Sequence, residues 1–426
     1  MKSKTVNAEK FSTYHILLII ILSFTQFTVV LDFMIISPLG DMVMKSMTLT
    51  PSQFGLCVAG YAIMAGVSGL LTAGFADRYD RKKLLLFFYT GFIVGTVLCG
   101  LANSYAMLLF ARIVTGFFGG VIGSVSLAIV ADVFPLEKRG RVMAFVQMGF
   151  AACQVLGVPI GLFVANAFSW QMPFFLISSI SILVCGVIIV KMRPVIGHLS
   201  LTQKESALSH LWETISSSYY RSGFLGTTLL SLGGFLLIPW ASAFAINNLS
   251  ITKPELPFLF MIVGICSLIV MPIVGKVSDK LDKFRIFTVA SICAVVMIVI
   301  YTNLTAAPFW EVAALNSAMM ICVLSRVIPA TALTTALPDI RDRGAYMSIS
   351  SSLQQIAGGL AAGIGGLIIS QGGKSQPIAH YNILGYLTAV ISIASILAIL
   401  RVNRLVSRHK EDKYLKEPEY PEMEII

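Results

Sequence analysis

The stretch "GFADRYDRKK", residues 74 to 83, places six charged side chains among ten positions. The sequence on both sides of it is almost entirely apolar, and over the whole chain 56% of the residues are hydrophobic and 12% are charged. Soluble domains carry about 25% charged residues. A chain with so little charge cannot cover a surface that faces water, so we expect an all-α integral membrane protein.

Twelve apolar runs are long enough to cross a bilayer, because about 20 apolar residues in a helix span a hydrocarbon core of about 30 Å. Runs of this length in lipid are helices, which satisfy their own backbone hydrogen bonds. The predicted spans are residues 14–39, 53–75, 84–103, 105–130, 142–166, 171–191, 222–247, 256–275, 286–304, 309–336, 346–370 and 380–400. A polar segment, 192–221, separates the first six spans from the last six.

The distribution of Lys and Arg predicts the orientation of these spans. With the N-terminus inside, only Lys45, Lys253 and Lys374 lie in outer loops, and only Arg112 and Arg326 lie in the interior of spans. Cytoplasmic loops carry an excess of Lys and Arg, so both termini are expected in the cytoplasm. The net charge of +10 therefore reports orientation, and we expect no nucleic-acid partner.

Two pairs of inner loops repeat at nearly the same distance along the chain. The charged stretch returns as "GKVSDKLDKFR" (275–285), and "PLEKRGRVMAF" (135–145) returns as "PDIRDRGAYMS" (338–348), each about 200 residues later. A shared offset in two different loops indicates a tandem duplication. The predicted domains are two six-helix bundles, 1–191 and 222–401, a cytoplasmic linker at 192–221, and a flexible cytoplasmic tail at 402–426.

These motifs carry a resemblance to a known family. The sequence "AGFADRYDRKK" (73–83) resembles the loop signature Gly-x-x-x-Asp-Arg-x-Gly-Arg-Lys of the major facilitator superfamily, with Ala73 and Asp80 in place of its glycines. Arg112-x-x-x-Gly116 and "GVPIG" (157–161) are similar to two further signatures of that family. Within it, the chain looks most like the twelve-helix drug–proton antiporters and arabinose-efflux-like permeases of bacteria.

The resemblance implies twelve helices in two pseudo-symmetric six-helix bundles with one central site that opens alternately to each side of the membrane. It implies a multi-pass protein of the bacterial inner membrane that works as a monomer on a small-molecule substrate. A proton gradient would supply the energy, and no cofactor or metal is expected.

In the family, the loop aspartate sits near the inner end of a helix of the other half and pairs with Arg. The resemblance therefore implies a conformational latch formed by Asp77, Arg78 and Arg81, with a second copy at Asp279 and Lys280. The alternative is that these charges only anchor the loop at the cytoplasmic surface.

Ionisable residues within a membrane are costly and mark candidate functional sites. Asp32 and Arg112 both fall roughly 8 Å to the outside of the centre of their spans, at 1.5 Å per residue, so they can pair if their helices are neighbours. Asp32 would take up a proton when the pair separates and release it when the pair re-forms, which predicts a proton-coupling site. The alternative is a static ion pair that holds the two spans in register.

A polar central cavity is predicted from side chains at helical spacing. Thr28 on the first span, and Ser351 and Gln355 on the eleventh, are expected to line it, and Trp240 to pack against apolar parts of the substrate. Arg326 would receive an anionic or carbonyl-bearing substrate group, since a buried cation needs an oxygen partner. Its alternative partners are hydroxyls such as those of Ser325 and Thr331.

The sequence therefore predicts a secondary active transporter, and the resemblance favours proton-coupled export of a small amphipathic organic compound or drug. Proton-coupled import of a small organic anion, and movement of lysolipid or lipid, stay open as alternatives. A membrane enzyme is disfavoured because the five histidines lie at span ends, in the linker or in the tail, and HExxH is absent. A channel would be expected to have filter loops or charged rings.

Overall fold

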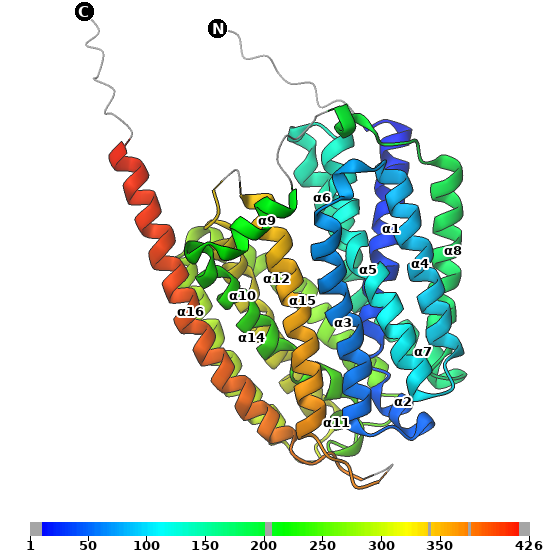
Figure 1. The fold of residues 1–426 in the computed structure, drawn as a ribbon. Coiled ribbons are helices and arrows are strands. Elements are labelled where there is room, and N and C mark those ends of the chain that lie inside the picture. The colour runs from blue at the N-terminus through cyan, green and yellow to red at the C-terminus, as the bar shows by residue number, and fades with distance from the viewer. Residues whose placement is uncertain (1–10, 201–206, 340–341, 374–375, 417–426) are drawn as a thin grey trace, which may run out of the picture.

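The computed structural model describes residues 11–200, 207–339, 342–373 and 376–416, and it is built almost entirely from helices arranged as two bundles side by side (Figure 1). The first bundle contains α1 (Thr13–Ile35), α2 (Gly40–Met47), α3 (Pro51–Ala73), η1 (Ala76–Arg78), α4 (Arg81–Leu101), α5 (Tyr105–Val133), α6 (Leu136–Ala152), η2 (Cys153–Gly157), α7 (Val158–Ala167) and α8 (Met172–Lys191). The linker contains η3 (Gly197–Ser200) and α9 (Ala207–Ser216). The second bundle contains α10 (Ser218–Phe235), η4 (Ile238–Trp240), α11 (Ala241–Asn247), α12 (Leu256–Lys280), α13 (Lys283–Thr302), α14 (Phe309–Thr335), α15 (Arg343–Ile368) and α16 (Tyr381–Lys416).

The twelve predicted spans correspond to twelve helical segments, two of which are composite. The fifth passes from α6 to α7 through the π-helical turn η2, and the seventh passes from α10 to α11 through the short 3₁₀ turn η4. In the described part of the chain, eleven segments are long and apolar enough to cross a membrane. The twelfth, α15, is long enough but less apolar, because it is rich in Ser, Gln and Gly.

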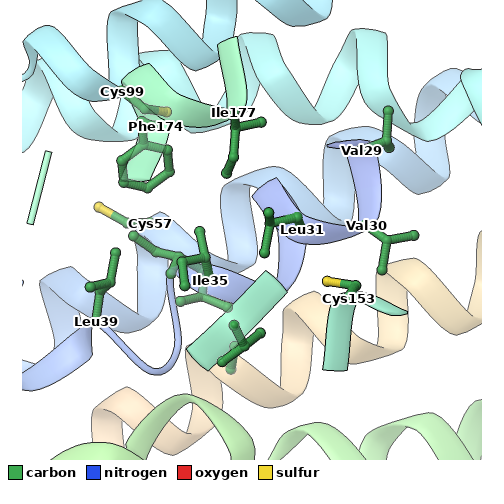
Figure 2. Close-up of a cluster of buried hydrophobic side chains, with 14 of the residues drawn as sticks. Val29, Val30, Leu31, Ile35, Leu39, Cys57, Cys99, Cys153, Phe174 and Ile177 are labelled. Carbon is green, nitrogen blue, oxygen red and sulfur yellow. The ribbon is translucent and has the colours of Figure 1, made fainter. Parts of the chain in front are cut away.

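The core of the first bundle is assembled around α1. Leu31 and Ile35 of α1 lie among buried side chains from α3, α4, η2 and α8, including three cysteines (Figure 2). All seven cysteines are free. Cys57, Cys99 and Cys153 are buried.

The two bundles meet along α3 and α15, which lie side by side through the centre of the molecule (Figure 1). Glycines on both helices permit the close approach. A Cβ atom on Gly66 of α3 would lie 2.6 Å from the carbonyl oxygen of Ser352, and one on Gly359 of α15 would lie 3.0 Å from that of Ala59. The Ser and Gly content that lowers the hydropathy of α15 therefore serves this contact, since small residues let helix backbones approach within a membrane.

The first described residues of α1 and the last of α16 lie at the same end of the molecule, which we call the termini end (Figure 1). α2 and α11 lie at the other end, which we call the distal end. This arrangement agrees with the even number of crossings predicted from the sequence.

Three predicted boundaries differ from the structure. α1 ends at Ile35 rather than at 39, and the chain then forms the separate short helix α2. Residues 402–416 were expected in a flexible tail, but they continue α16 as far as Lys416; residues 417–426 lie outside the described part. The second bundle begins at Ser218 rather than at 222, because residues 218–221, although polar, form the first turn of α10.

Candidate functional site

A buried ion pair joins α1 to α5 in the first bundle. Oδ2 of Asp32 lies 2.9 Å from Nη1 of Arg112, and both side chains are 0% exposed. The same Nη1 donates to the main-chain oxygen of Asp32 at 3.3 Å, and the hydroxyl of Thr96 on α4 donates to Oδ1 at 3.1 Å. The pairing that the two depths made possible is therefore present, and each carboxylate oxygen has a donor.

Only one of the three guanidinium nitrogens of Arg112 makes a hydrogen bond within the described part of the chain, whereas both carboxylate oxygens of Asp32 accept one. Its Cζ lies 4.4 Å from the ring centre of Tyr61 on α3, within cation–π range. Its Nε and Nη2 are buried and have no hydrogen-bond partner among the described residues. Removing an ion from water costs several kcal/mol even after relaxation, so compensation for this cation depends on Asp32 and the Tyr61 ring.

Glycines bring the three helices close enough to form this site. A Cβ atom on Gly116 of α5 would lie 2.2 Å from the carbonyl oxygen of Tyr61, and one on Gly95 of α4 would lie 2.5 Å from Oγ1 of Thr115. α3, α4 and α5 are therefore in close contact around Asp32 and Arg112. The glycine of the Arg112-x-x-x-Gly116 signature acts here as a packing position.

An aromatic contact extends from the ion pair to the second bundle. Phe33, next to Asp32 on α1, has its ring centre 5.3 Å from that of Tyr61 and 5.8 Å from that of Phe235 at the end of α10. Phe33 and Phe235 are half-buried, whereas Tyr61 is buried. The sequence analysis did not identify these two phenylalanines, although the position of Phe33 beside an intramembrane acid was a signal that could have marked it.

Two of the residues predicted to contact substrate are inaccessible in this conformation. Thr28 is fully buried against α4, where its hydroxyl lies 2.9 Å from that of Tyr89. Trp240 is fully buried against Phe54, with ring centres 5.7 Å apart. Neither side chain is accessible in this conformation, and the contact of Thr28 and Trp240 with substrate stays a prediction.

The two α15 residues predicted to contact substrate are accessible. Ser351 is exposed and Gln355 is half-buried. At 100° per residue, Ser351 lies on the helix face opposite Leu360, Ile364 and Leu367, which form the exposed apolar stripe of α15. Because that stripe has the character of a lipid-facing surface, Ser351 is placed toward the centre of the molecule.

Arg326 of α14 points toward α16. Nη1 donates to Oγ of Ser392 at 2.7 Å and Nη2 donates to Oγ of Ser395 at 3.2 Å, and both serines are fully buried. Hydroxyls do hold this cation, but Ser325 and Thr331 are not the residues that supply them. No carboxylate among the described side chains pairs with Arg326, and its role toward substrate stays a prediction.

The charged stretch 74–83 organises the termini end of the first bundle. Asp80, which replaces the second glycine of the signature, caps α4 through the N–H of Lys82 and also accepts from the N–H of Val195 at 2.9 Å. The ammonium of Lys82 donates to the carbonyls of Ile189 and Met192 at the end of α8. These contacts fix the start of the linker to the bundle.

The predicted latch residues are only partly placed. Arg81 is buried and pairs with Asp132 of α5 at 3.1 Å, a partner that the sequence analysis missed. Arg78 is exposed, and the side chain of Asp77 lies outside the described part of the structure. In the second copy, Asp279 and Lys280 are exposed, while Asp282 caps α13 through the N–H of Arg285 at 2.7 Å.

The sequence of this chain is similar to those of known membrane transporters. The family model of the Major Facilitator Superfamily matches residues 22–302 and 223–421. The uncharacterized MFS-type transporter YbcL of Bacillus subtilis (strain 168) is 24% identical over 400 residues, which cover 89% of this chain and 95% of that protein. Multidrug resistance protein 2 of the same organism is 24% identical over 310 residues, which cover 70% of this chain and 74% of that protein.

Solved structures show the same fold. A bacterial homologue of the human lysosomal transporter Spinster, in an inward-facing and unoccupied conformation, superimposes with a TM-score of 0.77 at 15% identity and covers 94% of this chain and 99% of its own. A D-xylose–proton symporter superimposes with a TM-score of 0.74 at 15% identity, covering 92% and 97%. The predicted fold of two six-helix bundles is confirmed. The chain is a transporter rather than an enzyme, and it belongs to the Major Facilitator Superfamily.

Proposed function

We propose that this protein exports small amphipathic organic compounds in exchange for protons, and that Asp32 and Arg112 form its proton-coupling pair. The observation that carries the proposal is the fully buried contact between Asp32 Oδ2 and Arg112 Nη1 at 2.9 Å. Among the described side chains, Asp32 and Asp41 are the carboxylates with almost no exposure, and only Asp32 lies in a membrane-crossing helix.

The pair can act as a switch because its two members respond differently to separation. Arg stays charged under all ordinary conditions, whereas a carboxylate in an apolar environment is neutralised by binding a proton. Any movement that separates α1 from α5 would therefore favour protonation of Asp32. A movement that restores the contact would favour proton release.

The energy available to such a switch is sufficient for useful transport. One charge that crosses a potential of 100 mV yields about 2.3 kcal/mol. At about 1.4 kcal/mol per factor of ten, this supports a substrate gradient of roughly fifty-fold. A single coupling carboxylate is enough when one proton is exchanged per substrate molecule.

The aromatic contact suggests where the substrate would act. Phe33 and Phe235 come from different bundles and are half-buried, so a ligand that enters between the bundles can reach them. Aromatic rings favour flat apolar or cationic groups. Phe33 adjoins Asp32 in sequence and contacts Tyr61, whose ring contacts Arg112. A substrate bound at these rings could therefore change the distance between Asp32 and Arg112.

The experiment uses everted membrane vesicles in which respiration or ATP hydrolysis acidifies the interior. A panel of amphipathic compounds, including ethidium and chloramphenicol, is added after energisation, and a pH-sensitive dye reports the gradient. Proton antiport predicts that a transported compound partly dissipates the gradient in wild-type vesicles and not in vesicles that carry Asp32→Asn.

Two controls make the result interpretable. Immunoblotting of the membranes shows whether Asp32→Asn is present in wild-type amount, and Ser178→Ala, which changes a buried hydroxyl on α8, should behave as wild type. A compound that is transported without any change in the pH gradient would contradict proton antiport. Uptake coupled to proton flow in the same direction would establish symport instead.

A further inference from the structure

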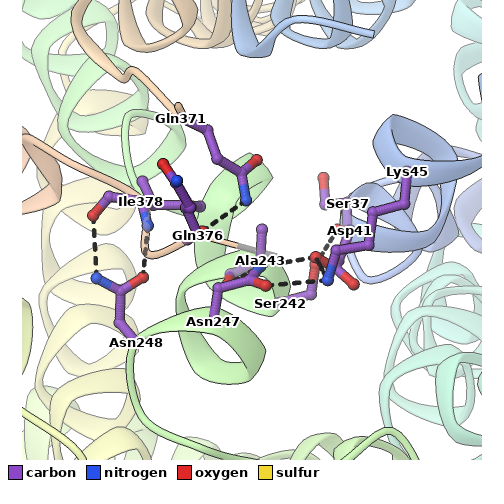
Figure 3. Close-up of polar contacts among 10 residues, drawn as sticks. All are labelled: Ser37, Asp41, Lys45, Ser242, Ala243, Asn247, Asn248, Gln371, Gln376 and Ile378. Atoms are coloured by element: carbon purple, nitrogen blue, oxygen red, sulfur yellow. Dashed lines mark hydrogen bonds and ion pairs between the residues drawn. The ribbon is translucent and has the colours of Figure 1, made fainter. Parts of the chain in front are cut away.

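At the distal end, the two bundles are joined by a compact polar cluster formed by Asp41 and Lys45 of α2 and Asn247 of α11 (Figure 3). Nδ2 of Asn247 donates to Oδ1 of Asp41 at 2.7 Å, and Nζ of Lys45 donates to Oδ1 of Asn247 at 2.9 Å. Nζ of Lys45 also lies 2.8 Å from Oδ1 of Asp41. Each member therefore contacts the other two, and we call the three residues the distal triad.

The burial of the triad makes these contacts strong. The side chain of Asp41 is 1% exposed and that of Lys45 is 23% exposed. Oδ2 of Asp41 is buried, and no group in the described part of the chain donates to it. The anion therefore depends on the two donors at Oδ1, one of which is the amide of the other bundle.

Lys45 is the only cation that can serve Asp41 on the elements packed around it. α2 packs against α3, η4 and α11, all of which lie within the described residues. α11 and η4 carry no titratable side chain, and α3 carries only the buried Cys57 and Tyr61. Separation of Asn247 from the triad thus leaves one intrahelical ion pair to support the anion.

Two further side-chain hydrogen bonds between described residues join the bundles at this end, and in both the acceptor is a main-chain oxygen. The hydroxyl of Ser242 donates to the carbonyl of Ser37 at 2.9 Å, and Nδ2 of Asn166 donates to the carbonyl of Lys253 at 2.9 Å. Hydrogen bonds to ionised groups contribute roughly twice as much as neutral ones. The triad is therefore the strongest polar connection between the bundles at the distal end.

We propose that the distal triad is the lock that holds the transporter closed at its distal end, and that Asn247 is the residue that engages it. In the closed state Asn247 satisfies Asp41 and Lys45 together, because its amide supplies one donor and one acceptor. In the open state Asn247 withdraws with α11, and water replaces it at Asp41 and Lys45, which stay paired on α2. Opening therefore replaces the amide of Asn247 by water at the ion pair of Asp41 and Lys45. Because the pair itself stays intact, no buried ion is left without a partner.

The proposal rests on the alternating access of the proposed function, but it does not depend on substrate identity or on proton coupling. Closure at one end and opening at the other are alternatives in a pair of bundles that rock about a central contact. Weakening the triad should therefore loosen the distal end and tighten the termini end. This opposite response separates a lock from a residue that merely stabilises the fold.

The neighbouring residue offers a matched control. Asn248 has the same side chain and makes two hydrogen bonds, with Nδ2 donating to the carbonyl of Ile378 at 2.9 Å and Oδ1 accepting from its N–H at 2.8 Å. Asn247 makes two hydrogen bonds across the bundles and a third within α11, where Nδ2 donates to the carbonyl of Ala243 at 2.9 Å. Ile378 belongs to the second bundle, as does Asn248, so these bonds do not cross between bundles (Figure 3). Asn247→Ala and Asn248→Ala remove equal numbers of atoms one residue apart.

The experiment measures hydrogen–deuterium exchange of the full chain in lipid nanodiscs, without substrate and at constant pH. The distal end is followed in peptides covering 38–49 and 241–251, and the termini end in peptides covering 139–150 and 268–280. We expect Asn247→Ala to raise the open-to-closed ratio at least about ten-fold, which corresponds to about 1.4 kcal/mol. Exchange should rise at the distal end and fall at the termini end, and Asp41→Asn should shift it in the same sense.

Asn248→Ala should leave the termini end as in wild type and raise exchange only near its own contacts. The proposal is overturned if Asn247→Ala and Asn248→Ala have the same effect, or if Asn247→Ala changes nothing. It is also overturned if exchange rises at both ends, since that pattern indicates general destabilisation. A failure of proton coupling in the vesicle assay would leave all of these outcomes unchanged.

Discussion

The ion pair between Asp32 and Arg112 leads to an asymmetric prediction for the two single substitutions. Asp32→Asn leaves a permanently charged guanidinium in a site with 0% exposure, with Nε and Nη2 already lacking partners. Breaking a buried pair in this way costs about 3–5 kcal/mol. Arg112→Met leaves a carboxylate instead, and the carboxylate can become neutral by binding a proton.

The asymmetry should appear as a difference in pH dependence. In Arg112→Met the ionised Asp32 is destabilising and the protonated Asp32 is not, so the loss of stability relative to wild type should shrink as the pH falls. In Asp32→Asn the loss should be nearly independent of pH, because Arg112 cannot lose its proton. The double variant should be more stable than Asp32→Asn alone, because it contains neither buried charge.

The size of the coupling can be worked from the contact. Two unit charges about 4 Å apart attract by about 4 kcal/mol at an effective dielectric constant of about 20. A double-mutant cycle should therefore give a coupling energy of a few kcal/mol, well above the roughly 1 kcal/mol expected for removing the Thr96 hydroxyl with Thr96→Val.

The assay follows thermal unfolding of the purified protein with a thiol-reactive fluorophore. Cys57, Cys99 and Cys153 are buried in the first bundle and become reactive when it unfolds. The reasoning is refuted if Asp32→Asn and Arg112→Met lose equal stability at every pH. It is also refuted if the double variant loses the sum of the two single losses.

Three further predictions concern packing, the linker and the aromatic contact. Gly116→Ala should lower thermal stability by about 1–3 kcal/mol, because its methyl group would overlap the main chain of Tyr61. Gly275→Ala, with open space around it, should change stability by less than about 0.5 kcal/mol; equal losses would show that the close contact is unimportant. Lys82→Met should increase the rate of limited proteolysis after α8, because two carbonyls lose their donor, and an unchanged rate would argue against anchoring. Phe235→Ala should weaken binding of flat aromatic compounds about 2- to 10-fold, as measured by titration, whereas unaltered affinity would place the substrate elsewhere.

The fold was largely predictable because each of its signals is local in the sequence. Hydrophobic length alone identifies the spans, and the repeated charged loops identify two halves. Depth showed that Asp32 and Arg112 could pair if their helices were neighbours, and the structure brings those helices together. The role of the charged stretch was harder to predict. The capping of α4 by Asp80 is a local contact, but the hydrogen bond from the N–H of Val195 to Asp80 joins parts of the chain that are distant in sequence.

Features that depend on the rotation of a helix about its axis were not predictable from one sequence. Depth placed Arg326 within its predicted span, but depth does not reveal that its guanidinium turns toward Ser392 on α16. Trp240 was predicted to pack against apolar parts of the substrate, and in this conformation its ring lies against Phe54 and α15. The distal triad requires knowledge of how the bundles dock, since Asp41 and Asn247 are distant in sequence.

The central claim, that Asp32 exchanges its proton during transport, is tested most directly in proteoliposomes by comparing two modes of transport in Asp32→Asn. One mode is exchange of labelled for unlabelled compound at equilibrium, which needs no energy. The other is accumulation against a gradient driven only by a difference in pH. We predict that Asp32→Asn retains exchange and loses accumulation. Accumulation at the wild-type level in this variant would contradict the assignment of Asp32 as the coupling group.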